Sequence, residues 1–117
     1  MEKPHKREII YYKNYYFDFF ERQRPEVQKK FNWTIHLIAT LDRVPVKFFK
    51  HITGTKGLYE MRVEVGTDVF RVFCFFDAGM LVVLLNGFHK KTQKTPGKEI
   101  QLALKLMDKY YYEKEIK

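Results

Sequence analysis

The sequence is poor in the residues on which several common chemistries depend. It has one cysteine, Cys74, which excludes a framework of intramolecular disulfides and a thiolate metal site. It has no serine at all, and it lacks the GxxxxGK[ST], GxGxxG and HExxH motifs and the acidic clusters of two-metal catalysis. We therefore expect neither a metal nor another cofactor. If the chain is an enzyme, its cations have to carry the chemistry.

Long apolar runs are also missing. No stretch approaches the roughly 20 apolar residues of a membrane span. The first residues, 1–16, are charged from the start and contain neither an uninterrupted apolar core nor a small-residue cleavage site. These features predict a cytoplasmic protein without a membrane partner.

Acidic residues are the scarcer of the charged residues. The 117 residues include 22 Lys and Arg against 14 Asp and Glu, which gives a net charge of +8. A hydrophobic fraction of 45% and an aromatic fraction of 17% exceed what a disordered basic tail carries. The length fits one domain spanning residues 1–117. The sequence thus predicts a folded basic domain whose partner is nucleic acid, an anionic surface or an acidic protein.

Hydrophobic spacing predicts an α+β fold. Apolar residues at helical spacing indicate one helix from Pro25 to about Leu41, a short second helix from Pro45 to about Ile52, and a third that begins at Thr95. The β-branched and aromatic run Ile9–Tyr12 predicts a first strand. Residues 15–20 either extend that strand or begin a helical turn.

Three further strands are predicted in the second half of the chain. Tyr59, Met61 and Val63 alternate with charged residues, which is typical of a half-buried strand. Turn residues separate this strand from two others, 69–76 and 80–85. Strands joined by such tight turns form an antiparallel meander. The complete order is strand, two helices, three strands, helix.

Two arginines interrupt the predicted strands. Arg62 lies between Glu60 and Glu64 and either pairs with them on a solvated face or contributes to a site. Arg71 lies in the apolar strand 69–76, so its guanidinium has to be paired, to reach the sheet edge or to open onto a cleft.

A basic segment follows the last predicted strand. There is no acidic residue between Asp77 and Glu99, and residues 86–94 carry four basic side chains: His89, Lys90, Lys91 and Lys94. Neighbouring meander strands bring this segment close to Arg62 and Arg71. Cations that stabilise a pentavalent phosphate, together with a base and an acid, are what RNA cleavage by a ribose 2′-OH requires. A solvated lysine cluster with an incidental histidine is the alternative interpretation.

The stretch from Gly57 to Leu104 carries several motifs at compatible spacing: LYEMR, FRV and GFHKKTQKTPGKEIQLA. They resemble the HigB, phage Gp49-like branch of the RelE/ParE toxin superfamily, whose members typically show a LYElR strand, a [FY]R[IV] strand and a GF-x-KKT-x-KTP-x-x-EI-x-x-A ending. The resemblance implies a RelE-like, microbial-RNase-like fold and a toxin that cuts mRNA in the ribosomal A site. It also implies a cognate HigA-type antitoxin with a helix-turn-helix domain.

The resemblance also implies roles for individual residues. Arg62 falls where relatives place a strand cation near the scissile phosphate, and Arg71 falls on their transition-state arginine. The basic residues that assist proton transfer correspond to His89, Lys90 and Lys91. The C-terminal tyrosine of some relatives has no clear counterpart, because Tyr110–Tyr112 lie much later in the chain, so the general acid and base stay open.

Five lysines are expected to bind RNA or the ribosome: Lys47, Lys50, Lys56, Lys94 and Lys98. Two other functions remain compatible with the sequence. One is a ParE-like inhibitor of DNA gyrase, which shares the fold but needs no cleavage residues. The other is a non-catalytic basic module whose cations only contact phosphate.

Overall fold

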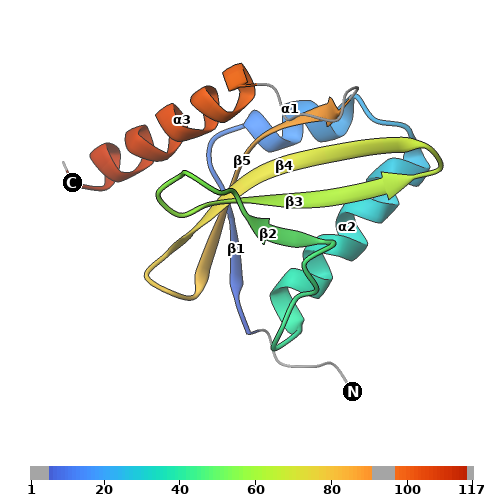
Figure 1. Ribbon diagram of the computed structural model, residues 1–117, viewed down its shortest axis with the longest axis horizontal. Coiled ribbons are helices and arrows are strands. Elements are labelled where there is room, and N and C mark those ends of the chain that lie inside the picture. Colours follow the sequence, from blue (N-terminus) through green and yellow to red (C-terminus); the bar gives the residue numbers. More distant parts are fainter. Residues whose placement is uncertain (1–5, 91–96, 116–117) are drawn as a thin grey trace.

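The computed structural model describes residues 6–90 and 97–115, which form a five-stranded sheet and three helices (Figure 1). The strand order is β1-β5-β4-β3-β2, with β1 parallel to β5 and all other neighbours antiparallel. The elements are β1 (Glu8–Tyr11), α1 (Tyr15–Glu21), α2 (Pro25–Thr40), β2 (Phe49–His51), β3 (Leu58–Val65), β4 (Asp68–Asp77), β5 (Leu81–Lys90) and α3 (Gly97–Glu115). This arrangement confirms the α+β fold and the antiparallel meander, and it is compatible with a RelE-like fold.

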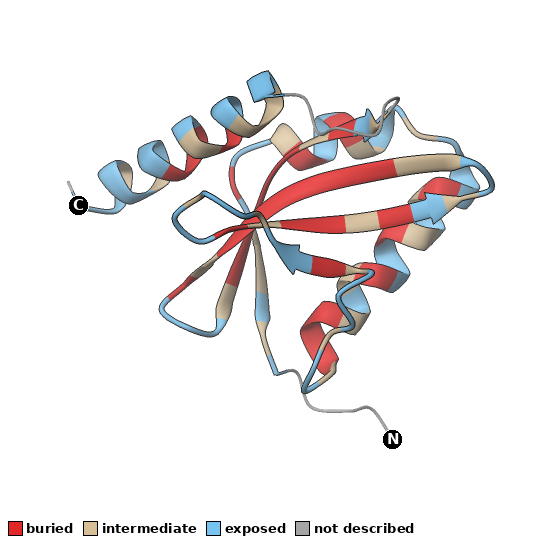
Figure 2. Ribbon diagram, viewed as in Figure 1, coloured by how far each residue is buried: buried red, intermediate tan, exposed pale blue. Residues whose placement is uncertain are grey.

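Helices cover both faces of the sheet. We call the two sides the α1/α2 face and the α3 face. The first is filled by apolar side chains that include Phe31, Ile38, Met61, Val72 and Leu84. The second is filled by Phe73, Val83, Leu85, Ala103 and Leu106. Consequently the central strand β4 is buried along most of its length (Figure 2).

Helix α3 packs across β4 and β5 and is held at both ends. Near its start, Asn86 Nδ2 lies 3.4 Å from the carbonyl oxygen of Glu99. In its last turns, Tyr110 Oη and Lys114 Nζ each donate to Asp77 Oδ2 at 2.7 Å. The ends of β3 and β4 on the right of Figure 1 extend beyond this helix. None of the helices in the described part of the chain is long and apolar enough to cross a membrane.

A β-bulge interrupts the pairing of β4 with β5. Val72 lies opposite Gly87, whereas Cys74 lies opposite Leu84, so β5 has one extra residue at this point. The extra residue changes which side chains of β5 share a face. Before the bulge odd-numbered residues lie on the α3 face, and after it even-numbered residues such as Phe88 and Lys90 do.

Gly87 lies at the bulge, where α1 crosses the sheet closely. A Cβ atom at this position would lie 2.6 Å from Cδ2 of the buried Phe19 ring. Only glycine therefore lets α1 and β5 pack at this distance. The approach explains a glycine in the middle of a buried strand.

The short helix predicted from Pro45 to Ile52 is wrong. The carbonyl of Pro45 accepts hydrogen bonds from the amides of Phe48 and Phe49, and the chain then continues as strand β2. Phe49 pairs with Met61 on β3 and is buried, whereas Val46 is 71% exposed. The spacing of the apolar residues matches a helical face, but only part of that face is buried, and the edge of the sheet determines the conformation.

Three other predictions are resolved by the structure. The helix beginning at Pro25 is confirmed and ends at Thr40, with Pro25 in its first turn. Tyr15–Glu21 forms helix α1 and does not extend the first strand. The last meander strand was predicted to end at Leu85 and instead continues to Lys90, so His89 belongs to a strand and not to a loop.

Candidate functional site

Charged side chains from four strands gather on the α3 face. Arg62 lies opposite Arg71, Val69 lies opposite Lys90, and Lys50 lies opposite Glu60. Directly paired residues of antiparallel strands project to the same face. We name the resulting set the cation cluster, and it consists of Lys50, Glu60, Arg62, Arg71 and Lys90. Its four cations outnumber Glu60 and the adjacent Glu64, which lies on the same face and pairs with Arg62.

The Arg71–Glu60 ion pair is the buried part of the cluster. Arg71 NH1 donates to Glu60 Oε1, and each side chain is only 6% exposed. Burial lowers the pKa of Arg71, and the neighbouring Arg62 lowers it further. Arg71 Nε is buried without a hydrogen-bond partner among the described residues. A buried ion pair generally stabilises a fold less than well-packed apolar residues would, and perturbed groups of this kind are frequent in functional sites.

Arg62 and Lys90 lie nearer the solvent. The Arg62 side chain is 36% exposed, and its Nε donates to Glu64 Oε1 at 2.9 Å. The pKa of Lys90 is lowered, chiefly by burial and then by the charge of Arg71, while Glu60 acts in the opposite direction. A lysine whose pKa is lowered gives up its proton more readily than an exposed one. The cluster thus combines the accessible guanidinium of Arg62, the ammonium of Lys90 with its lowered pKa, and the buried carboxylate of Glu60.

His89 lies on the opposite face from the cation cluster. Its ring stacks on Phe70 with a centroid distance of 4.6 Å, and its Nε2 lies 3.1 Å from Asp68 Oδ1. Asp68 also accepts a hydrogen bond from Arg24 at 2.9 Å. The expectation that His89 converges with Arg71 is therefore not met. The bulge in β5 gives that position to Lys90.

The sequence also matches a known protein family over most of its length. Residues 18–108 match the model of the family described as phage-derived protein Gp49-like (DUF891). The chain belongs to this family. The Gp49-like family is part of the RelE/toxin-like group, which is consistent with a toxin of a toxin–antitoxin system. No curated protein matches the sequence significantly.

The remaining lysines of this Gp49-like protein are more dispersed. Lys50 belongs to the cluster, but Lys47 lies in the segment before β2, with its Nζ 4.9 Å from the centroid of the Phe48 ring. Lys56 is exposed between β2 and β3, and Lys98 is exposed in the first turn of α3. Two other predicted residues lie outside the described part of the chain: Lys91 and Lys94.

Glu60 is the residue that sequence reasoning missed as a member of the site. It was considered only as a surface partner of Arg62, but Arg62 pairs with Glu64, and Glu60 pairs with Arg71 across the strands. The signal was present in the spacing, because Glu60 and Arg62 lie two residues apart on one face. Diagonal neighbours on adjacent strands are within reach of long side chains.

The site offers little to a metal ion. Within residues 6–90 and 97–115, no three side chains of His, Cys, Asp or Glu cluster as a metal ion requires. Cys74 is buried in the α1/α2 face, and burial raises the pKa of its thiol. Around Arg71, the ionisable groups on the α3 face are those of the cation cluster together with Glu64.

Proposed function

We propose that this Gp49-like protein is a HigB-like toxin of a type II toxin–antitoxin system and cuts mRNA as a ribosome-dependent endoribonuclease. The observation that carries the proposal is the cation cluster, in which three strands present Arg62, Arg71 and Lys90 on one face around Glu60. Its excess positive charge complements a phosphodiester backbone. The family and its toxin-like group support the same conclusion.

The proposed reaction is an internal transesterification. The ribose 2′-oxygen forms a bond to its own phosphorus, and the bond from phosphorus to the 5′-oxygen breaks. The products are a 2′,3′-cyclic phosphate and a 5′-hydroxyl. Glu60 accepts the proton of the 2′-OH, and Lys90 donates a proton to the leaving 5′-oxygen. Arg62 and Arg71 stabilise the additional negative charge of the pentavalent state.

The other predicted residues keep supporting roles in this proposal. Lys50 extends the cluster at the surface and positions the RNA backbone, as do the more distant lysines predicted for RNA or ribosome binding. Lys91 is proposed to assist near the cleavage site. His89 is assigned no step, because it lies on the other face of the sheet. A HigA-type antitoxin and the A site of cytoplasmic ribosomes are the proposed partners.

The test compares a cluster lysine with an exposed lysine of α3. Replacing Lys90 with Met removes the proposed proton donor, and we expect mRNA cleavage to fall by about 100-fold or more. Lys105→Met makes the same chemical change on α3 and should leave cleavage unchanged. Cleavage is measured by mapping 5′-hydroxyl ends of mRNA after induction, with and without translating ribosomes. Growth arrest and cleavage at wild-type levels in Lys90→Met would contradict the proposal.

One observation favours a second function, that of a non-catalytic RNA-binding module. Both arginines of the cluster already donate to carboxylates, Arg62 to Glu64 and Arg71 to Glu60. In that case the wild type yields no new mRNA ends, and Lys90→Met reduces the salt dependence of RNA binding by about one counterion. Intact mRNA with gyrase-linked DNA breaks would instead indicate a gyrase inhibitor.

A further inference from the structure

The first strand forms one free edge of the sheet. β1 pairs only with β5 in the strand order, so its other side has no neighbouring strand within the described residues. The amide of Glu8 donates to Met80, and the amide of Tyr12 donates to Leu84. Peptide groups alternate in direction along a strand. The peptide groups of Ile9 and Tyr11 therefore point outward from the sheet.

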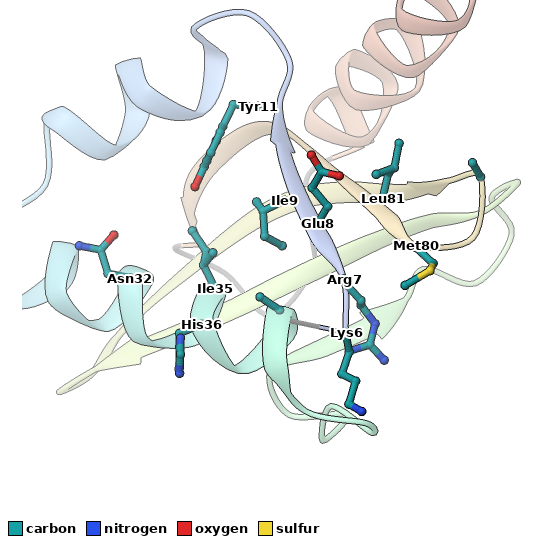
Figure 3. Close-up of a pocket in the computed structure, with 12 residues that line it drawn as sticks. Lys6, Arg7, Glu8, Ile9, Tyr11, Asn32, Ile35, His36, Met80 and Leu81 are labelled. Atoms are coloured by element: carbon teal, nitrogen blue, oxygen red, sulfur yellow. The ribbon is translucent and has the colours of Figure 1, made fainter. Parts of the chain in front are cut away.

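A groove lies beside this edge, between β1 and helix α2 (Figure 3). Its volume is about 980 Å³. Ile9 from the strand and Ile35 from the helix contribute apolar surface to it, and Tyr11 lies at one end. Met80 lines the other end and is 60% exposed. An apolar groove next to outward-facing peptide groups has the features that strand addition requires.

The charges around the groove indicate the chemistry of the occupant. Lys6, Arg7 and His36 line it, against a single acidic lining residue, Glu8, and the exposed carboxylate of Asp42 lies 3.4 Å from Lys6 Nζ. Arg7 donates to the carbonyl groups at the end of α2, including Ile38 at 2.9 Å, which fixes its positive charge beside the groove. A second copy of this chain is a poor occupant, because each copy carries a net charge of +8.

We propose that β1 and the groove bind an extended segment of a partner protein in which apolar residues alternate with acidic ones. The segment adds to the sheet as a new outer strand beside β1. Its backbone pairs with Ile9 and Tyr11, its apolar side chains enter the groove toward Ile35, and its acidic side chains face Lys6. This inference is independent of the proposed RNA cleavage, because the cation cluster lies on the α3 face and on other strands.

The probe is an acetylated nine-residue peptide in which valine alternates with glutamate. We expect micromolar binding, with amide hydrogen exchange of Ile9 and Tyr11 slowed at least about tenfold at saturation, as measured by NMR. The amides of Ile10 and Tyr12 already lie on the side of β1 that pairs with β5 and should change little. A peptide whose alternate amides are N-methylated on the pairing edge should not bind.

Charge complementarity is tested with a matched pair of variants. Lys6→Glu should weaken peptide binding about tenfold, whereas Lys109→Glu, the same change on exposed α3, should alter the Kd by less than about twofold. Unchanged spectra elsewhere report that each variant is folded. The proposal is overturned if the peptide leaves Ile9 and Tyr11 exchange unaffected, or if both variants weaken binding equally. Concentration-dependent protection without peptide would overturn it in favour of a second copy.

Discussion

At the scale of single residues, the Arg71–Glu60 pair is the most consequential contact. Its two side chains are almost completely removed from solvent, on a face whose neighbouring positions are filled by Phe73 and Phe88. Desolvation of two charges offsets much of their attraction, so apolar residues of similar volume would serve stability as well or better. The pair thus adds little stability that apolar residues could not supply, and a part in the proposed RNA site would account for its charges.

This argument predicts different outcomes for single and double variants. Glu60→Leu leaves the Arg71 charge buried and unpaired, and we expect it to lower the free energy of unfolding by about 3 kcal/mol or more. The double variant Glu60→Leu with Arg71→Met removes both charges and should recover most of that loss in urea denaturation. It should nevertheless be inactive in mRNA cleavage. A stable double variant that still cleaves mRNA at the wild-type rate would exclude a catalytic role for the pair.

At the scale of elements, the contact of α1 with β5 depends on one glycine. Because a methyl group at Gly87 would overlap the Phe19 ring, we expect Gly87→Ala to destabilise the fold by about 1–3 kcal/mol. Gly97→Ala is the control, since no atom lies within 4 Å of a Cβ at that position. The measurement is the urea midpoint at an unchanged m-value.

The proposed cause can be checked with a compensating change. Phe19→Leu shortens the ring side chain that the new methyl group meets, so the double variant with Gly87→Ala should be more stable than the two single effects predict when added. A coupling of about 1 kcal/mol is expected for residues in direct contact. Simple additivity would show that the overlap at Phe19 is not the source of the destabilisation.

Most elements were predictable because their patterns are local. Pro25 and apolar residues at helical spacing define α2, and alternation from Tyr59 onward defines β3. The segment after Pro45 was not predictable, because its conformation follows from pairing with β3, a contact distant in sequence. The same holds for the parallel pairing of β1 with β5.

The candidate site was predictable to the extent that strand neighbours are. Arg62 and Arg71 could be placed together because they lie on consecutive meander strands. His89 could not be placed, since a bulge has no simple sequence signature and reverses the facing of every later residue in β5. Glu60 was missed because the choice between two nearby arginines depends on three-dimensional distances.

At the scale of the whole molecule, a buried carboxylate on β4 holds helix α3 against the sheet. The ammonium of Lys114 and the hydroxyl of Tyr110 hold the pKa of Asp77 below its ordinary value. A depressed carboxyl pKa stabilises the fold fully above the unfolded-state pKa of about 4, and this contribution is lost as the pH falls through the folded-state pKa. The domain should therefore lose part of its stability as the pH falls below about 4.

Replacing Asp77 with Asn isolates this contribution. At pH 7 we expect the free energy of unfolding to fall by about 1–2 kcal/mol, because hydrogen bonds to a charged group are lost. Below about pH 4 the variant and the wild type should converge. Asp42→Asn removes a carboxylate that is 83% exposed and should change stability by less than about 0.5 kcal/mol. Parallel pH profiles for Asp77→Asn and the wild type would contradict this assignment.

The bulge in β5 determines on which face of the sheet each of the last five side chains of the strand lies. With the extra residue present, Lys90 faces Arg71 and His89 faces Phe70. If the same residues paired with β4 without the bulge, strict alternation would exchange their faces, and the His89 imidazole would lie on the face of the Arg71 guanidinium. The gain or loss of this bulge therefore changes which basic side chain joins the cation cluster without substituting any of its residues. Relatives can be compared residue by residue only when their bulges are aligned first.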